Sequence, residues 1–127
     1  ESPEQVLKWW RDAAGICELW KAVSVSGADD LEELDQWRVD RLLIDAAPAE
    51  DADNPGGNGE TMDWSLLDGF EPGVPWILAG GLTPENVEAA ITETGADAVD
   101  VSSGVERARG LKDEDLIRAF IDAAKSV

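Results

Sequence analysis

The sequence contains no histidine and a single cysteine, Cys17. Without histidine, the chain cannot form a Ser-His-Asp triad, a Cys-His pair or a His-rich zinc site from its own residues. A single thiol excludes both a Cys-rich zinc site and an internal disulfide, which fits a reducing cytosol. These classes of catalytic and metal site are therefore excluded within this chain.

Positive charge is also scarce, because 10 Lys and Arg residues face 28 Asp and Glu residues in a chain of formal net charge -18 at pH 7. Duplex nucleic acids and anionic membrane surfaces bind clustered Lys and Arg, so we expect neither as a partner. The acidic residues are spread over every expected helix, which is typical of a solvated acidic surface. A sharper hypothesis is halophilic adaptation, since concentrated salt would screen the repulsion between these charges.

The sequence has no apolar run of membrane-spanning length, and no signal peptide precedes the first expected helix. We therefore expect a cytoplasmic protein. The chain begins at Glu1 without an initiator Met, which we interpret as a sign of processing, cutting or excision. Its 127 residues, 43% of them hydrophobic, suffice for one domain with a core and are too few for two.

The hydrophobic pattern predicts one helix followed by four strand-helix units. Ser2 is the expected cap of the first helix, Pro3 its first residue, Gln5 the partner in a capping box and Gly15 its end. Short apolar runs predict strands over residues 19–25, 41–46, 74–81 and 97–104. Helical patterns cover residues 28–38, 63–69, 82–95 and 113–126, and residues 47–62 form the longest irregular segment.

Apolar strands that alternate with amphipathic helices indicate an α/β fold with a parallel sheet and right-handed crossovers. Four strands alone leave two unpaired edges, and natural proteins close, cover or charge such edges. We therefore predict that these strands belong to a TIM-type barrel. They would form a single partial-barrel domain over residues 1–127 that association with another piece completes.

Small residues end the last two predicted strands. Gly80 and Gly81 lack Cβ atoms, which lets backbone N–H groups approach a ligand oxygen closely. Ser102, Ser103 and Gly104 add hydroxyls and further N–H donors after the next strand. Either group alone commonly forms a tight turn, but successive strand ends of this kind favour a phosphate site.

Two carboxylates lie at the same strand ends. Asp45 follows an apolar strand, where burial would raise its pKa and allow it to act as a general acid. An equally open interpretation is that Asp45 caps a helix or braces a loop. Asp100 lies two residues before Ser102, on the same face by strand alternation, and would either bind ligand hydroxyls or anchor the loop.

The segments "LLIDA", "PGGNGETMDWSLL", "WILAGGLTPENV" and "VDVSSGVE" together resemble the second part of phosphoribosylanthranilate isomerase, a (βα)8-barrel family of tryptophan biosynthesis. The resemblance runs in order across nearly the whole chain. It implies an Amadori rearrangement of N-(5-phosphoribosyl)anthranilate that needs no metal and no cofactor. The expected ligand is accordingly a phosphorylated sugar substrate, or a phosphate or sulfate ion.

The resemblance also assigns roles to residues. Asp45 matches the general acid that protonates the furanose ring oxygen, and Asp100 a carboxylate near the substrate hydroxyls. The phosphate-binding loops match Gly80, Gly81, Ser102, Ser103 and Gly104. The mobile loop beside the general acid matches Gly56, Gly57, Asn58 and Gly59, whose glycines suit a backbone that moves or turns sharply.

Two residues of the family have no counterpart here: the general-base cysteine after the first barrel strand, and an arginine that meets the anthranilate carboxylate. Cys17 lies between the first helix and the first strand, so it cannot be that base. By this resemblance the chain is the C-terminal half of the barrel, with the missing N-terminal half-barrel as its partner. We expect negligible activity from the chain alone, because one acid-base group contributes on the order of a hundred- to ten-thousandfold in rate.

A non-catalytic alternative is a self-associating structural module, in which a second copy of the chain pairs with the exposed sheet edges. A further alternative is another phosphate-binding barrel isomerase or synthase. Trp9 and Trp10 are adjacent on the first helix and cannot both face inward, so we expect one of them at an interface.

Overall fold

The structure is a computed structural model that describes residues 2–15, 17–47 and 63–127. The predicted mobile loop, Gly56 to Gly59, lies outside the described residues. In the described part, no helix is long and apolar enough to cross a membrane. The elements in chain order are α1 (Pro3–Ala14), β1 (Trp20–Ser24), α2 (Ala28–Glu32), the 3₁₀ helix η1 (Glu33–Gln36), β2 (Arg41–Asp45), the 3₁₀ helix η2 (Ser65–Leu67), β3 (Trp76–Ala79), α3 (Val87–Thr94), β4 (Ala98–Val99), the 3₁₀ helix η3 (Ser103–Val105), β5 (Glu106–Ala108), β6 (Leu111–Lys112) and α4 (Glu114–Lys125).

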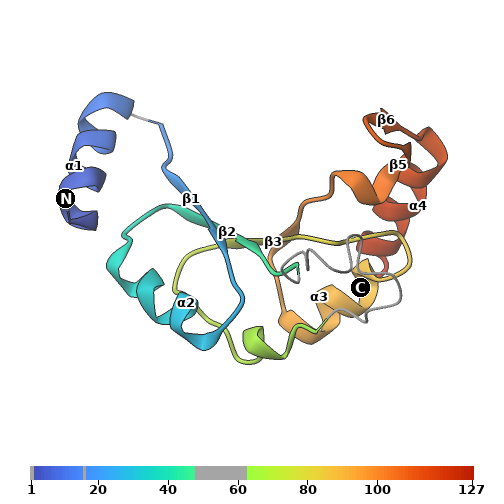
Figure 1. The fold of residues 1–127 in the computed structure, drawn as a ribbon, viewed down its shortest axis with the longest axis horizontal. Helices are drawn as coiled ribbons and strands as arrows, with labels where there is room; N and C mark the ends of the chain where they lie inside the picture. The colour runs from blue at the N-terminus through green and yellow to red at the C-terminus, as the bar shows by residue number, and fades with distance from the viewer. Residues whose placement is uncertain (1, 16, 48–62) are drawn as a thin grey trace, which may run out of the picture.

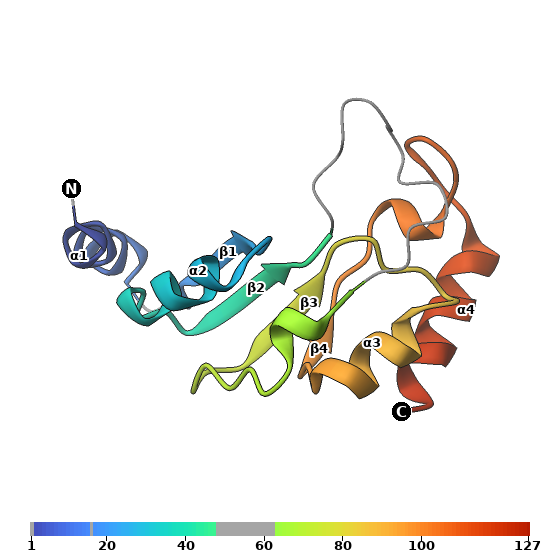
Figure 2. The ribbon, with the colours of Figure 1, turned by 60° about the horizontal axis from the view of Figure 1, so that its bottom comes forward.

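Strands β1 to β4 form one parallel sheet in chain order, which confirms the predicted parallel α/β arrangement (Figures 1 and 2). Its register places Ser24, Asp45 and Ala79 in one row at the carboxyl ends of β1, β2 and β3. Within the described residues, β1 and β4 are the edge strands and have no further partner. The sheet therefore has the two unpaired edges that the sequence predicts.

The two faces of this sheet differ in burial. On one face, Leu42, Ile44, Trp76 and Leu78 are buried and belong to the main apolar cluster together with Val87 of α3. Figure 1 shows α2 and α3 on this side of the sheet, below it in that view.

The other face of the sheet is open. Because side chains alternate along a strand, it carries Ala22, Ser24, Leu43 and Ala98. These are exposed or half-buried, and no described helix lies across them in either view (Figures 1 and 2). This open face is the surface that a barrel would turn toward its interior.

The ends of α1 follow the sequence prediction. Ser2 Oγ accepts a hydrogen bond from Gln5 N at 3.3 Å, Gln5 Oε1 accepts one from Ser2 N at 3.4 Å, and Pro3 is the first helical residue. Gly15 ends the helix by donating its N–H to the carbonyl of Arg11 at 3.1 Å. The capping box, the proline and the terminal glycine are therefore confirmed.

The inner surface of α1 is formed by Leu7, which is buried, whereas Trp9 and Trp10 are 56% and 60% exposed. Both indoles therefore remain on the surface of the described chain. Figure 2 shows α1 and α4 at opposite ends of the molecule, with the sheet between them.

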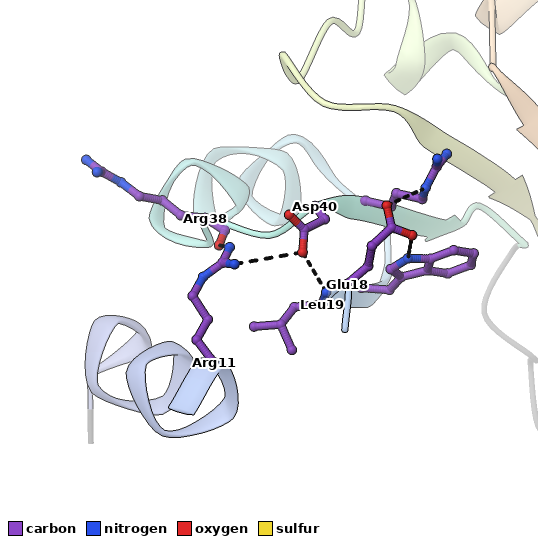
Figure 3. A network of polar contacts seen from close by, with 7 residues as sticks. Arg11, Glu18, Leu19, Arg38 and Asp40 are labelled. Carbon is purple, nitrogen blue, oxygen red and sulfur yellow. Dashed lines mark hydrogen bonds and ion pairs between the residues drawn. The ribbon is translucent and has the colours of Figure 1, made fainter. Parts of the chain in front are cut away.

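A polar network connects α1 to the start of the sheet (Figure 3). Arg11 donates to the carbonyl of Arg38 at 2.8 Å and lies 3.8 Å from the carboxylate of Asp40. Asp40 in turn accepts a hydrogen bond of 2.6 Å from the backbone N–H of Leu19, directly before β1. One carboxylate thus holds the amino ends of β1 and β2 together and faces the cation of α1.

Several predicted boundaries are wrong for local reasons. Helix α3 begins at Val87, later than the predicted range 82–95, because Thr83 and Asn86 exchange backbone-to-side-chain hydrogen bonds of 2.7 and 3.3 Å that form a turn. Gly95, with φ of +70°, ends the helix as predicted. The helix expected over residues 28–38 divides into α2 and η1, and the backbone is extended again at Trp37.

The fourth strand is shorter than the predicted range 97–104. Pairing with β3 covers Ala98 and Val99 and continues through a hydrogen bond of 2.9 Å from Asp100 N to Leu78 O. The chain then turns into η3 and forms the antiparallel hairpin of β5 and β6, which the sequence analysis missed. A glycine between two short extended runs, here Gly110, is the sequence signal that could have predicted this hairpin.

Helix α4 buries only part of its apolar face. Phe120 is buried and Leu116 and Ala124 are half-buried, but Ile117 and Ile121 are 36% and 45% exposed. The apolar stripe is wider than the described neighbours α3 and η3 cover. An apolar margin of α4 therefore remains on the surface.

Candidate functional site

The predicted catalytic carboxylate, Asp45, lies at the carboxyl end of the parallel strands. Asp45 is the last residue of β2, and its carbonyl accepts a hydrogen bond of 2.8 Å from Val25 N. Next to it, Ala46 N donates to Ala79 O at 3.0 Å, so β1, β2 and β3 are still tied together at this edge. Because Ile44 is buried on the covered face, alternation directs the Asp45 side chain to the open face.

Asp45 and Gly80 are in direct contact. Asp45 Oδ1 accepts a hydrogen bond of 3.0 Å from Ala47 N, which is the loop-bracing arrangement that the sequence left open. A Cβ atom added at Gly80 would overlap this oxygen and lie 2.7 Å from Ala47 N, and φ at Gly80 is +95°. The carboxylate therefore fits only beside a residue without a side chain. The general-acid role of Asp45 stays a prediction.

The loops after β3 and β4 also touch. A Cβ atom added at Gly104 would overlap the carbonyl oxygen of Leu82, at 2.9 Å from its carbonyl carbon and 3.1 Å from Val101 Cγ2. Leu82 is 2% exposed, so its backbone has little room to withdraw. The segments 80–82 and 102–104 thus lie side by side, as the predicted two-loop anion site requires.

The first of these loops is held by Asn86. Its Nδ2 donates to the carbonyl of Gly81 at 3.0 Å, while its Oδ1 accepts from Thr83 N. The backbone of Gly81 has φ of +68°, a left-handed conformation that favours glycine. Sequence reasoning placed this segment in the helical range 82–95 and missed Asn86 as the residue that fixes the loop.

The second loop is held by Lys112 of β6. Its Nζ donates to the carbonyl of Ser102 and to Glu106 Oε2, both at 2.7 Å, and Glu106 Oε1 accepts from Gly110 N at 2.8 Å. The hydrogen bond from Lys112 and then that from Gly110 lower the pKa of Glu106 from its ordinary value of 4.5. Lys112 is thus a contact of the predicted site that sequence reasoning did not find.

The remaining predicted residues border the loops. Asp100, Ser102 and Ser103 are exposed. Asp100 continues the open-face alternation of Ala98, but the same argument does not extend to Ser102, because β4 ends at Val99 and Ser102 has ψ of -87°. The structure brings these residues to one edge without the regular strand geometry that the prediction assumed.

Cys17 lies at the amino-terminal end of the strands, opposite to the end that carries Asp45. It is exposed and lies three residues before Trp20, which pairs with Arg41 at the amino ends of the strands. From this row to the row of Asp45 is four residues, or about 13 Å. Cys17 is therefore remote from the Asp45 carboxylate. The described part of the chain also contains no group of His, Cys, Asp or Glu residues suited to hold a metal ion.

A hollow of about 950 Å³ lies along α1, lined in part by Leu7, Lys8, Arg11 and Arg38. It is at the amino-terminal side of the sheet and contains none of the predicted site residues. The predicted site residues lie instead in the loops after the strands, where Asp100, Ser102 and Ser103 are exposed.

Comparison with known proteins identifies a family whose model matches most of the chain. The family model described as "N-(5'phosphoribosyl)anthranilate (PRA) isomerase" matches residues 4–123. An N-(5'-phosphoribosyl)anthranilate isomerase of Hyphomonas neptunium is 56% identical over 111 residues, which are 87% of this chain and 53% of that protein. The chain spans about half the length of the curated relatives it matches.

Solved structures agree. The crystal structure of phosphoribosyl anthranilate isomerase from Thermotoga maritima has a TM-score of 0.77 and 36% identity, over 100% of this chain and 70% of that one. A phosphoribosyl anthranilate isomerase in complex with reduced 1-(o-carboxyphenylamino)-1-deoxyribulose 5-phosphate has a TM-score of 0.72 and 33% identity, over 100% and 68% of the two chains.

Proposed function

The chain belongs to the N-(5'-phosphoribosyl)anthranilate isomerase family, and on this premise we propose that it supplies the acid and the phosphate loops of an active site for the Amadori rearrangement in tryptophan biosynthesis. One observation carries the proposal: the Asp45 carboxylate contacts Gly80 at the edge where the loop of Leu82 contacts Gly104. Ring opening of a phosphorylated sugar needs a proton donor, and its phosphate needs N–H donors; both are available at the carboxyl ends of these strands.

In the proposed reaction, Asp45 donates a proton to the furanose ring oxygen, and the ring carbon-oxygen bond breaks. The open-face direction of the side chain supports this role, because that face would line the interior of a barrel. A base must then remove a carbon-bound proton to complete the rearrangement. Cys17 is too remote to serve as this base, at more than about 13 Å along the strands.

The phosphate is bound by backbone N–H groups of the loops at Gly80–Gly81 and Ser102–Gly104, with Asp100 near the sugar hydroxyls. The relative solved with a deoxyribulose 5-phosphate derivative supports a ligand of this class. Local N–H dipoles hold an anion even though the chain carries a net charge of -18. No residue in this proposal requires a metal or a cofactor.

We further propose that the described sheet is the C-terminal half of a barrel, a single partial-barrel domain over residues 1–127 that association with further barrel strands completes. Three surfaces support this: the open sheet face, the unpaired edges β1 and β4 of the described sheet, and the exposed margin of α4 at Ile117 and Ile121. The missing half would supply the base and the opposite wall of the site.

The test mixes this chain with the N-terminal half of the Hyphomonas neptunium relative and follows consumption of N-(5'-phosphoribosyl)anthranilate. Asp45→Asn in the mixture should lower the rate by a hundredfold or more. Asp122→Asn is the matched control, because Asp122 is exposed on α4 and the charge change is the same. Equal rates for the two variants would rule out Asp45 as the acid.

A further inference from the structure

The hairpin β5–β6 contributes one side chain to the predicted phosphate loop. Lys112 Nζ lies 2.7 Å from the Ser102 carbonyl oxygen and 2.7 Å from Glu106 Oε2, while 49% of its side chain is exposed. Glu106 is only 13% exposed and also accepts the N–H of Gly110. The ammonium group is therefore held at the carbonyl by a well-fixed carboxylate.

Lys112 makes the shorter of two contacts that fix the direction of the next N–H group, because the Ser102 carbonyl also accepts a hydrogen bond of 3.4 Å from Val105 N in η3. The described part of the chain has no cis peptide bond, so the Ser102 carbonyl and the Ser103 N–H point in opposite directions from one planar unit. Since Lys112 holds the carbonyl on the hairpin side, the Ser103 N–H points away from the hairpin. An ammonium on the carbonyl also polarises the peptide group and strengthens its N–H as a donor.

The neighbouring loop has the same construction. Asn86 Nδ2 holds the carbonyl of Gly81 at 3.0 Å, which directs the N–H of Leu82 away from the Asn86 side. Leu82 and Gly104 are in contact, so both oriented peptide units belong to one continuous loop surface. In each loop, a side-chain nitrogen donates a hydrogen bond to a backbone carbonyl: Asn86 to Gly81, and Lys112 to Ser102. Neither carbonyl oxygen is then turned toward an anion bound at the loops.

We propose that Lys112 is a positioning residue for the phosphate group: it acts through the Ser102–Ser103 peptide, aiming the Ser103 N–H at the phosphate without touching the phosphate itself. This inference rests on the proposed function, since it needs a phosphate at these loops.

The experiment titrates the 127-residue chain with ribose 5-phosphate and follows the NMR amide signals of Ser103 and Gly104. Lys112→Met should raise the dissociation constant about tenfold, the effect of one charge-assisted hydrogen-bond arrangement. Lys8→Met is the matched control, because it removes the same charge and Lys8 also forms an exposed ion pair, at 2.8 Å from Asp12. Its dissociation constant should stay within about twofold of the wild-type value.

Salt separates positioning from simple attraction. A long-range effect of the lost charge is screened at 1 M NaCl, where the Debye length is about 3 Å, whereas a misdirected N–H stays misdirected. The tenfold difference should therefore persist at 1 M NaCl. The Ser103 amide signal of Lys112→Met should also move before any ligand is added, and Lys112→Arg should restore part of the affinity.

Glu106→Gln provides a second variant, because it keeps the lysine charge but weakens its anchor; it should raise the dissociation constant by less than Lys112→Met. Equal affinities of wild type and both variants, or a difference that vanishes at 1 M NaCl, would overturn the role of Lys112 and leave the phosphate site intact. Absence of any shift of the Ser103 and Gly104 signals in the wild type would overturn the phosphate site and this inference together.

Discussion

Gly104→Ala is the most direct perturbation of the contact between the two loops. The new Cβ would overlap the Leu82 carbonyl oxygen and lie 2.9 and 3.1 Å from the Leu82 carbonyl carbon and Val101 Cγ2. The first two of these atoms are backbone of a buried residue, so a rotamer change cannot relieve the overlap. Overpacking of this kind costs about 1–3 kcal/mol, and rigid backbone neighbours place this case near 3.

Urea unfolding followed by tryptophan fluorescence measures the effect. With a slope of about 1.5 kcal/mol per molar urea, a loss of about 3 kcal/mol lowers the midpoint by about 2 M. Gly27→Ala is the control, because no heavy atom lies within 4 Å of its added Cβ and neither glycine has a positive φ. Its stability should change by less than about 0.5 kcal/mol. Midpoints of the two variants less than about 0.5 M apart would refute the contact.

Three further predictions concern other parts of the chain. Gly80→Ala should destabilise by about 2 kcal/mol, and adding Asp45→Ala should recover part of that loss in a double-mutant cycle, because the new Cβ meets the Asp45 carboxylate; strict additivity would argue against the contact. Asp40→Ala should cost about 1 kcal/mol in urea unfolding, because it removes the acceptor of the Leu19 N–H, and an unchanged midpoint would contradict this. The pKa of Glu106 in the folded chain is below its ordinary value of 4.5, so the ionised carboxylate stabilises the fold above pH 4.5, and this stabilisation is lost as the pH falls through the lower folded pKa. The difference in urea midpoint between wild type and Glu106→Gln should therefore close below pH 4.5. A difference that stays constant with pH would exclude the effect.

The order and type of the main elements follow from the sequence because their signals are local. Apolar runs gave the four parallel strands, and the Ser2, Pro3 and Gly15 signals gave the ends of α1. Boundaries failed where side chains compete for the backbone, as at Thr83 and Asn86, whose reciprocal hydrogen bonds delay the start of α3.

In the candidate site, too, the residues with a local sequence signal were predicted and those that depend on tertiary contacts were not. Gly80 and Gly104 were predicted from their residue type, and the structure adds the neighbours that require glycine, the Asp45 carboxylate and the Leu82 carbonyl. Lys112 was not predicted, because its contact with Ser102 depends on how the β5–β6 hairpin folds back over ten residues. Such contacts depend on tertiary geometry and leave no periodic pattern in the sequence.

We propose that residues 1–127 hold the acid and the phosphate loops of an isomerase site and do not include its base. The most direct measurement is turnover of N-(5'-phosphoribosyl)anthranilate by the purified 127-residue chain, alone and with the N-terminal half of a relative. The account predicts negligible turnover alone and a rate at least about a hundredfold higher in the mixture. A rate for the chain alone that equals that of the mixture would contradict it.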